Sequence, residues 1–248
     1  MRTARILADG RVREVRLEHG RLIDESGREH DPETATFLLP FEPGTIFGLA
    51  LNYRGHAGEL GLSEPEEPVL FLKPAASLVP HRAPVERPRG VRYLHYEAEL
   101  AVVIGRAGRR IPEREAMEYV LGYTVANDVT VRDFVGNLFR PPVKAKGWDT
   151  FTPLGPYLVT RDEVADPHDL SLAAYVNGEL RQRGHTSEMV HAIPEIIAYL
   201  SRFLTLKPYD VILTGTPRGL SPVAAGDLMR IEVEGVGVLE NPVVEEAA

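Results

Sequence analysis

The chain of 248 residues contains no cysteine. This absence excludes disulfides, thiolate nucleophiles and zinc sites built from thiolates, and it leads us to expect a reducing compartment, the cytoplasm. No apolar run approaches the roughly 20 residues that a membrane helix needs, so we expect no membrane-spanning segment. The N-terminus, MRTARILADGRVREVRLEHG, carries charges throughout and lacks the apolar core of a signal peptide.

Lysine is scarce, and positive charge does not dominate. Apart from histidine, every basic residue is arginine except Lys73, Lys144, Lys146 and Lys207, so each lysine is a candidate for a specific role. The formal net charge of −8 argues against a broad nucleic-acid surface. A local basic pocket for an anionic small molecule remains compatible with it.

The pattern of short apolar segments predicts a protein rich in strands. Residues 1–40 alternate polar and apolar positions between turn signals at Asp9-Gly10, His19-Gly20 and Ser26-Gly27, which predicts a small β-meander. Further strands are predicted at Ile46–Tyr53, Pro68–Pro74, Tyr96–Gly105, Tyr123–Thr130, Asp210–Pro217 and Asp227–Val243.

Two longer segments have the pattern of helices. Pro112–Gly122 has proline near its first turn and glycine at its end. Thr186–Leu206 places apolar residues at spacings of three and four, with Pro194 at the start of its regular part. Arg54–Gly61 is predicted to be a short helix or a loop. Because strands outnumber helices and do not alternate with them, the sequence predicts an α+β, mainly β fold.

Two glutamates precede the most apolar strand. Residues at i and i+2 of a strand point to the same side, so Glu97 and Glu99 are neighbours. A half-exposed strand with an acidic face would explain them, but the strand continues as LAVVI, which is apolar on both faces and typical of a buried strand. Like charges entering such a place require protons or a cation.

A third carboxylate, Asp128, ends the next apolar strand. Three carboxylates without histidine or cysteine suit a hard divalent cation, and Mg²⁺ also keeps waters that a substrate can displace. The residues therefore predict a Mg²⁺ site at Glu97, Glu99 and Asp128, with Mn²⁺ or Ca²⁺ as alternatives.

Seven segments in series carry a family resemblance. They are LNYRGHAGELG, FLKP, YEAELAVVIG, GYTVANDVTVRD, KGWDTFTPLGP, VNGELRQRGHTSEM and ILTGTPRG. Together they resemble the fumarylacetoacetate hydrolase family over roughly residues 45–243. The resemblance implies a mixed β-sheet roll over residues 43–248, with residues 1–42 as a small N-terminal β-meander. It also implies a divalent metal, usually Mg²⁺, at Glu97, Glu99 and Asp128, and a homodimer.

Three residues are candidates for catalysis. His56 and Glu59 lie at i and i+3, so on a helix they form either a solvent-facing pair or a dyad in which the carboxylate orients a proton-carrying imidazole. The family uses such a pair on a mobile lid. Lys146, in KAKGWDTF, matches the family's active-site lysine, and we expect it to stabilise developing negative charge. Lys144 is the less favoured neighbour, and a surface lysine is the alternative for both.

Three further residues are candidates for substrate binding. Arg132 follows Asp128 by four residues, where larger members of the family bind a substrate anion, although a surface salt bridge would also explain it. Thr216, in TGTP, resembles the position that holds a substrate carboxylate. Gln182, in GELRQ, is a weaker candidate.

Two positions depart from the family pattern. Val135 stands where the true hydrolase has a glutamine, which argues against fumarylacetoacetate itself as the substrate. Tyr209, in Pro208-Tyr209-Asp210, replaces a glycine that usually serves a positive φ, so this turn must accommodate a side chain.

The metal site alone is compatible with isomerisation, decarboxylation and C–C hydrolysis. The segment Asn137–Pro156 and the short meander resemble the homoprotocatechuate-degradation branch of the family. We therefore predict an isomerase/decarboxylase acting on 2-hydroxyhepta-2,4-diene-1,7-dioate or 5-oxopent-3-ene-1,2,5-tricarboxylate, both small dicarboxylic or tricarboxylic acids. An acylpyruvate- or fumarylpyruvate-type hydrolase, or an oxaloacetate decarboxylase, is the alternative. A non-catalytic dicarboxylate-binding protein is the alternative from another class.

Overall fold

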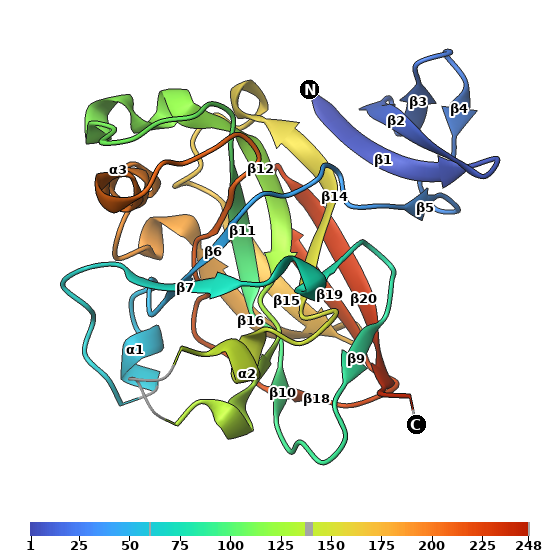
Figure 1. The fold of residues 1–248 in the computed structure, drawn as a ribbon. Helices are drawn as coiled ribbons and strands as arrows, with labels where there is room; N and C mark the ends of the chain where they lie inside the picture. Colours follow the sequence, from blue (N-terminus) through green and yellow to red (C-terminus); the bar gives the residue numbers. More distant parts are fainter. Residues whose placement is uncertain (60, 137–140, 248) are drawn as a thin grey trace.

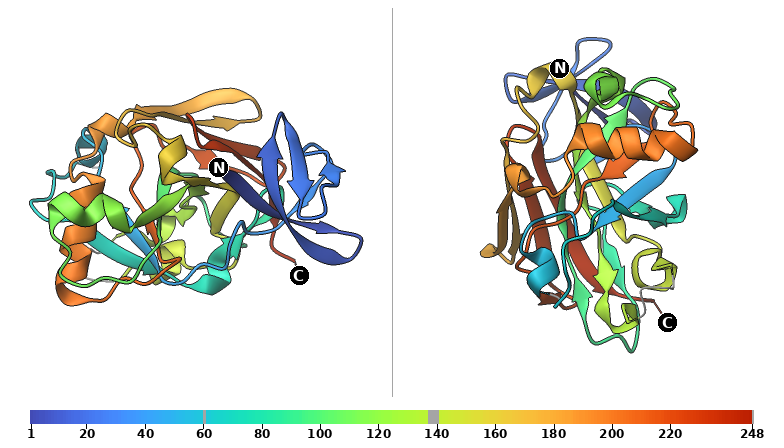
Figure 2. Two further views of the ribbon diagram at one scale, coloured as in Figure 1. Left: turned by 90° about the horizontal axis from the view of Figure 1, so that it is seen from above. Right: turned by 90° about the vertical axis from the view of Figure 1, so that its left-hand side faces the viewer.

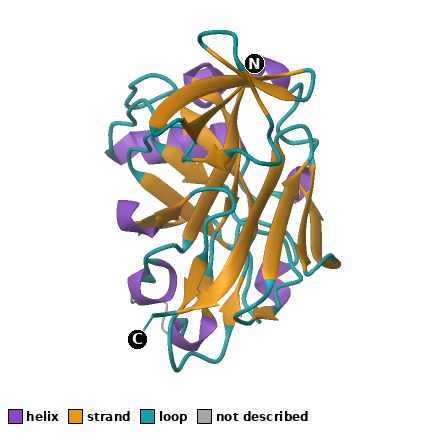
Figure 3. Ribbon diagram, turned by 90° about the vertical axis from the view of Figure 1, so that its right-hand side faces the viewer, coloured by secondary structure: helices purple, strands orange, loops and turns teal. Residues whose placement is uncertain are grey.

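The computed structural model describes residues 1–59, 61–136 and 141–247. Within these ranges strands form the body of the molecule and short helices lie at its margins (Figure 3). The predicted α+β, mainly β fold is confirmed. Of the segment Asn137–Pro156, residues 137–140 lie outside the described residues, as does Leu60 of LNYRGHAGELG.

The largest sheet has twelve strands and contains the N-terminal meander. Its order is β4-β3-β2-β1-β14-β12-β11-β17-β6-β7, with β5 on β1 and β8 on β14. The strands are β1 (Arg2–Ala8), β2 (Arg11–Glu18), β3 (Arg21–Asp24), β4 (Glu29–His30), β5 (Thr36–Phe37), β6 (Ile46–Ala50), β7 (Val69–Lys73), β8 (Leu78–Val79), β11 (Ala98–Ile104), β12 (Val120–Asn127), β14 (Thr152–Thr160) and β17 (Val211–Leu213).

Two smaller sheets complete the β structure. One has the order β16-β15-β19-β20-β9 and the other the order β13-β10-β18. Their strands are β9 (Val85–Arg87), β10 (Leu94–His95), β13 (Thr130–Val131), β15 (Ser171–Val176), β16 (Glu179–His185), β18 (Pro222–Val223), β19 (Leu228–Val233) and β20 (Gly237–Glu245).

Helical structure is short throughout the described residues. The α-helices are α1 (His56–Glu59), α2 (Val143–Lys146) and α3 (Ile193–Phe203). The 3₁₀ helices are η1 (Ala75–Ser77), η2 (Glu113–Tyr119), η3 (Arg132–Phe134), η4 (Arg161–Glu163) and η5 (Thr186–Glu188). No helix is long and apolar enough to cross a membrane in the part of the chain that the structure describes.

The main core lies between the largest sheet and the five-stranded sheet, because β11 and β12 pack against β15, β19 and β20. Every residue of β11 is buried, as its apolar sequence predicts. Leu100, Val102 and Ile104 face this core, while Ala101 and Val103 belong to a second apolar cluster. Because side chains two positions apart in a strand point to the same face, Glu99 lies on the face of Ala101 and Val103, opposite the main core.

The N-terminal meander is an extension of the largest sheet with its own small core. Strand β1 pairs with the edge of β14 at Arg2 and Thr3, and Ile6, Val15 and Leu22 are buried within the meander. It projects at the end of the molecule opposite α1 and α2 (Figures 1 and 2). The boundary at residues 42/43 stays a prediction.

The helix predicted over Pro112–Gly122 is present over Glu113–Tyr119 as a 3₁₀ helix, and the prediction was wrong for Val120–Gly122, which belong to a strand. The segment forms the 3₁₀ helix η2, and β12 begins at Val120, which pairs with Ile104 of β11. Gly122 lies inside that strand, where a Cβ would come within 2.1 Å of the Val159 carbonyl oxygen. The glycine therefore permits close approach of β12 and β14 and is not a helix cap.

The helix predicted over Thr186–Leu206 is real only from Ile193 to Phe203. Pro194 lies in its first turn, as predicted. Before it the chain leaves helical geometry, because the Val190 and His191 amides donate to Asn52, two residues after β6. A tertiary contact that periodicity does not reveal thus shortened the helix.

Candidate functional site

Glu97, Glu99 and Asp128 meet because β11 and β12 are antiparallel neighbours. Ala98 pairs with Asn127, so the start of one strand lies beside the end of the other. The Asp128 amide donates to the Glu97 carbonyl oxygen at 3.0 Å, and the Asn127 side chain accepts from the Glu97 amide at 2.9 Å. One oxygen from each of the three carboxylates lies within 4.8 Å of the others, and all three residues are buried.

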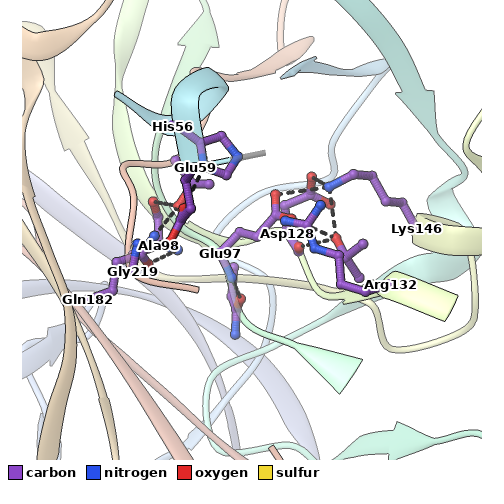
Figure 4. A network of polar contacts seen from close by, with 12 residues as sticks. His56, Glu59, Glu97, Ala98, Asp128, Arg132, Lys146, Gln182 and Gly219 are labelled. Carbon is purple, nitrogen blue, oxygen red and sulfur yellow. Dashed lines mark hydrogen bonds and ion pairs between the residues drawn. The ribbon is translucent and has the colours of Figure 1, made fainter. Parts of the chain in front are cut away.

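Three cations lie beside these carboxylates, and Figure 4 shows two of them, Lys146 and Arg132, with Glu97 and Asp128. Lys146 donates to Glu97 at 2.9 Å, to Asp128 at 2.5 Å and to the Thr130 hydroxyl at 2.8 Å. Arg132 donates to Glu97 at 2.7 Å. Lys73, from β7, donates to Asp128 and to the Phe151 carbonyl oxygen. Three buried acids are thus held beside three bases.

The two glutamates have opposite electrostatic environments. Burial opposes the ionisation of Glu97, but the positive charges of Lys146 and Arg132 lower its pKa to about 2. Burial raises the pKa of Glu99 well above its ordinary value, and the negative charges of Asp128 and Glu97 add to the effect. Burial also opposes the charge of Lys146, yet Asp128 and Glu97 raise its pKa above the ordinary value.

The donor set fits a hard divalent cation. Glu99 Oε2 accepts from the Gly215 amide at 2.7 Å, while its Oε1 is buried without a hydrogen-bond partner among the described residues. A buried carboxylate oxygen without a donor is costly unless something else binds it. The Glu97, Glu99 and Asp128 site could therefore hold a metal ion.

The predicted His56–Glu59 pair forms on α1, above this cluster (Figure 4). His56 is buried, and its Nδ1 lies 3.2 Å from Glu59 Oε2. The other oxygen of Glu59 accepts from the Gly219 amide at 3.2 Å. Because Glu59 engages Nδ1, the opposite ring nitrogen of His56 is available for proton exchange.

Thr216, in the loop after β17, and Gln182, in β16, lie beside the acids. Thr216 donates to the Ala98 carbonyl oxygen, and Gln182 donates to the Thr216 hydroxyl and to the Pro217 carbonyl oxygen. Gln182 also accepts from the Ala98 amide. Since both amide hydrogens of Gln182 are engaged, the geometry favours a role in holding this loop over direct contact with a substrate.

The structure separates the two lysines of KAKGWDTF. Lys146 is buried in the site, whereas Lys144 is exposed, with its ammonium group 4.1 Å from the centre of the Phe134 ring. The segment is a helix, so residues two apart do not share a face as they would in a strand.

Sequence reasoning missed Lys73 as a member of the site. It is fully buried, and its bond to Asp128 spans 55 positions of the chain. Burial lowers its pKa below the ordinary value, although the Asp128 charge opposes this. The signals that could have found it are the scarcity of lysine and the FLKP segment. The catalytic, substrate-binding and metal-binding roles of the nine residues predicted from the sequence stay predictions.

Comparison with known proteins relates the chain to one family. Residues 45–244 match the model of the fumarylacetoacetate (FAA) hydrolase C-terminal region. The chain is 50% identical over 215 residues to a 4-hydroxyphenylacetate degradation bifunctional isomerase/decarboxylase of Salmonella dublin, covering 86% of this chain and 50% of that protein. The chain spans about half the length of the three curated isomerase/decarboxylases that it matches.

Solved structures agree over the whole chain. A 5-carboxymethyl-2-hydroxymuconate delta-isomerase from Mycobacterium smegmatis is 39% identical, with a TM-score of 0.88 and 100% of both chains covered. A 2-hydroxyhepta-2,4-diene-1,7-dioate isomerase from Mycobacterium marinum is 34% identical, with the same TM-score and coverage. A maleylpyruvate hydrolase from Sphingobium sp. SYK-6, in complex with manganese(II) and pyruvate, is 30% identical, with a TM-score of 0.85 and 100% of both chains covered.

Proposed function

Because the chain belongs to the fumarylacetoacetate hydrolase family, we propose that it is a divalent-metal-dependent isomerase/decarboxylase. Its substrate is 2-hydroxyhepta-2,4-diene-1,7-dioate or 5-oxopent-3-ene-1,2,5-tricarboxylate, in homoprotocatechuate catabolism. The names of the Salmonella relative and of the two mycobacterial isomerases support this choice.

The observation that carries the proposal is the charge balance of the site. Lys73, Lys146 and Arg132 pair with Glu97 and Asp128, and Glu99 adds a third carboxylate beside them. A divalent cation therefore leaves the site with an excess of two positive charges, which a doubly charged acid would neutralise. This balance favours a dicarboxylate over a neutral substrate.

Mg²⁺ is the proposed ion, held by Glu97, Glu99 and Asp128. When bound, the cation supplies a Lewis acid for the 2-oxo acid end of the substrate. Lys146 keeps a positive charge beside the same carboxylates and stabilises negative charge that develops on the substrate. Arg132, whose side chain is 17% exposed, has further guanidinium N–H groups for the distal carboxylate.

Proton movement is assigned to His56. Isomerisation requires a proton to leave one carbon of the dienol and return at another, and decarboxylation requires a proton to replace the departing CO₂. Glu59 holds His56 Nδ1 and so leaves the other ring nitrogen to carry that proton. The Glu59–Gly219 bond holds α1 against the loop beside the site.

A hydrolase of acylpyruvates or fumarylpyruvate is the second candidate, supported by the likeness to the maleylpyruvate hydrolase. Loss of the dienol's ultraviolet absorbance, measured beside pyruvate release from an acylpyruvate, separates the two. The isomerase predicts rapid dienol loss with little pyruvate. Rapid pyruvate release without dienol loss would indicate a hydrolase. Mg²⁺-dependent binding of oxalate without any turnover would indicate a non-catalytic dicarboxylate-binding protein.

His56→Ala tests the proton carrier. We expect kcat for the dienol to fall by about 10² to 10⁴-fold, the usual contribution of a general acid–base, while Mg²⁺ affinity stays unchanged. Glu59→Gln should have a smaller effect in the same direction. Full activity of His56→Ala on every substrate that the parent protein converts would refute the dyad.

Arg132→Ala tests recognition of the distal carboxylate. We expect KM to rise more for the dicarboxylate than for a monocarboxylate analogue, because only the former has a group for the guanidinium to bind. The analogue controls for the loss of the Arg132–Glu97 bond, which affects both substrates alike. An equal rise for both would assign Arg132 to the support of Glu97 alone.

A homodimer in the cytoplasm completes the proposal. The chain mass is 27.5 kDa, so light scattering after gel filtration should give about twice this value.

A further inference from the structure

Tyr96 connects the core beside the acid cluster to the loop that follows β17. It immediately precedes Glu97, and its side chain is completely buried in the main core. Its hydroxyl donates to the Gly219 carbonyl oxygen at 3.1 Å and lies 2.7 Å from the hydroxyl oxygen of Ser221. Because tyrosine has one hydroxyl hydrogen and a carbonyl oxygen can only accept, Ser221 is the donor to Tyr96. Burial also raises the pKa of Tyr96 above its ordinary value, so the phenol keeps its proton at neutral pH.

Gly219 continues this connection to α1 (Figure 4). Its amide donates to Glu59 Oε1 at 3.2 Å, and Glu59 Oε2 lies 3.2 Å from Nδ1 of His56. Gly219 therefore accepts from Tyr96 with its carbonyl group and donates to Glu59 with its amide. These four residues form an unbroken chain of hydrogen bonds from the neighbour of a proposed metal ligand to the imidazole of His56.

Two side chains support different parts of the loop after β17. Gln182 of β16 holds the beginning of the loop, because it donates to Thr216 and to the Pro217 carbonyl oxygen. Tyr96 holds the part that contains Gly219. Gly219 has φ of +105°, and a Cβ on it would lie 3.3 Å from Gln182 Cα, so its backbone packs closely on β16. The direction of its amide therefore depends on where Tyr96 holds its carbonyl group.

A helix as short as α1 depends on attachments of this kind, because one turn of helix is not stable by itself. The backbone bonds of α1 are local: the His56 amide donates to the Tyr53 carbonyl oxygen, and the Glu59 amide to that of Gly55. The bond between Glu59 and Gly219, by contrast, joins residues 160 positions apart. It fixes the carboxylate of Glu59, and with it the ring of His56, relative to the rest of the site.

We propose that Tyr96 is a positioning residue for the His56–Glu59 pair: its hydroxyl fixes Gly219, whose amide fixes Glu59, which in turn orients His56. The proposal rests on the proposed function, in which His56 carries the proton, and adds a residue that acts on it indirectly. Reacting groups must be held closely in place for efficient catalysis. A tyrosine at position 96 therefore serves the reaction in a way that a phenylalanine of nearly the same shape would not.

The first test is kinetic and uses a double-mutant cycle. Tyr96→Phe should lower kcat for the dienol about 5- to 10-fold, the effect of losing one hydrogen bond, while KM and the calorimetric Kd for Mg²⁺ stay within about twofold. In a Glu59→Ala background the same substitution should lower kcat less than about twofold, because the connection to His56 is already broken. A merely structural role would give the same factor in both backgrounds.

The second test does not depend on turnover. Hydrogen exchange followed by mass spectrometry measures how often the amides of α1 open. In Tyr96→Phe we expect the exchange of peptides covering residues 54–59 to be about 5-fold faster than in the parent protein, because α1 has lost part of its attachment. Peptides from the N-terminal meander, at the opposite end of the molecule, should exchange at the parent rate.

Tyr123 provides a matched control. It too is completely buried in the main core, and its hydroxyl has no hydrogen-bond partner among the described residues. Tyr123→Phe therefore removes the same atom without breaking a connection to α1. It should keep both the parent kcat and the parent exchange rate of residues 54–59. Thermal unfolding of all variants establishes that they are folded.

Unchanged exchange of residues 54–59 in folded Tyr96→Phe would overturn the assignment, as would an equal loss of kcat with and without Glu59. A loss of Mg²⁺ affinity that accounts for the lower activity would also overturn it, because Tyr96 would then act through Glu97. If Tyr96→Phe does not fold, Ser221→Ala, which removes the donor to the same hydroxyl, takes its place under the same criteria. A parent protein that leaves the dienol unchanged, but whose α1 exchanges faster in Tyr96→Phe alone, would refute the proposed isomerase and retain this inference.

Discussion

At the scale of single residues, the sequence predicted the acidic residues of the site but not all of the basic residues that pair with them. Glu97 and Glu99 stand out because two charges precede a strand that is apolar on both faces, and Asp128 because it ends the neighbouring one. Lys73 left only a weak signal, since its pairing with Asp128 depends on how β7 lies relative to β12. A sequence shows which groups are out of place more readily than which groups compensate them.

Lys73→Met should destabilise the metal-free protein by about 1 to 3 kcal/mol, because it leaves one buried oxygen of Asp128 without its donor while Lys146 still pairs with the other. Added Mg²⁺ should recover much of this loss, since a cation among the same carboxylates replaces the missing positive charge. Urea unfolding with and without Mg²⁺ measures both effects. Lys144→Met, which removes an exposed lysine from α2, is the control and should lose little in either condition.

At the scale of elements, local patterns were reliable where they did not compete with tertiary contacts. The apolar positions Ile193, Ile196, Ile197 and Leu200 are buried on α3 as their spacing predicts. The segment before them is drawn away to bind Asn52. The turn at Tyr209 keeps the left-handed conformation, with φ of +66°, and the ring stacks on Phe41 at 5.7 Å. Tyr209 thus adopts the positive φ that glycine usually serves, and its ring packs against Phe41.

His81 joins three elements and should make their association sensitive to pH. Its Nδ1 accepts from the Glu240 amide of β20 at 3.0 Å, and its ring packs edge-on against Phe37 of β5 at 5.1 Å. Burial, with help from the Arg82 charge, lowers the pKa of His81 to about 4. A histidine whose pKa is lowered in the folded state stabilises the fold fully above its unfolded pKa of about 6.5 and loses this contribution as the pH falls towards 4.

His81→Gln should therefore flatten the pH dependence of stability. Between pH 7 and pH 5 the parent protein should lose about 2 kcal/mol through His81, whereas a glutamine oxygen still accepts from Glu240 and does not titrate. Urea unfolding at both pH values gives the difference. His19→Asn, at an exposed turn position, should keep the parent slope. If His81→Gln shows the same change in unfolding free energy between the two pH values as the parent protein, His81 is not the group responsible.

At the scale of the whole molecule, composition and strand pattern predicted the fold class but not the sheet order. The meander was expected from the turns in residues 1–40, yet its pairing with β14, far along the chain, was not. Similarly, the sequence does not reveal that β17 lies between β11 and β6. These long-range pairings bring β7, β11, β12 and the loop after β17 to one place, so the site depends on the arrangement of the entire large sheet.

Because the site depends on the whole large sheet, a bound metal ion should stabilise the protein against global unfolding. The proposed ligands lie at the start of β11 and just after β12, and their contacts with Lys73 on β7 and Gly215 after β17 connect strands distant in sequence. At 100 times its Kd, Mg²⁺ should stabilise the folded state by about 2.7 kcal/mol, which for a chain of this length raises Tm by roughly 5 to 10 °C. Glu97→Gln should lose most of this shift, and Glu118→Gln, which removes an exposed carboxylate paired with Arg106, should keep it. Differential scanning calorimetry with and without Mg²⁺ measures the three shifts. An equal shift in Glu97→Gln would mean that the ion binds elsewhere, because a site buried under the central strands cannot lose a charged ligand without losing affinity.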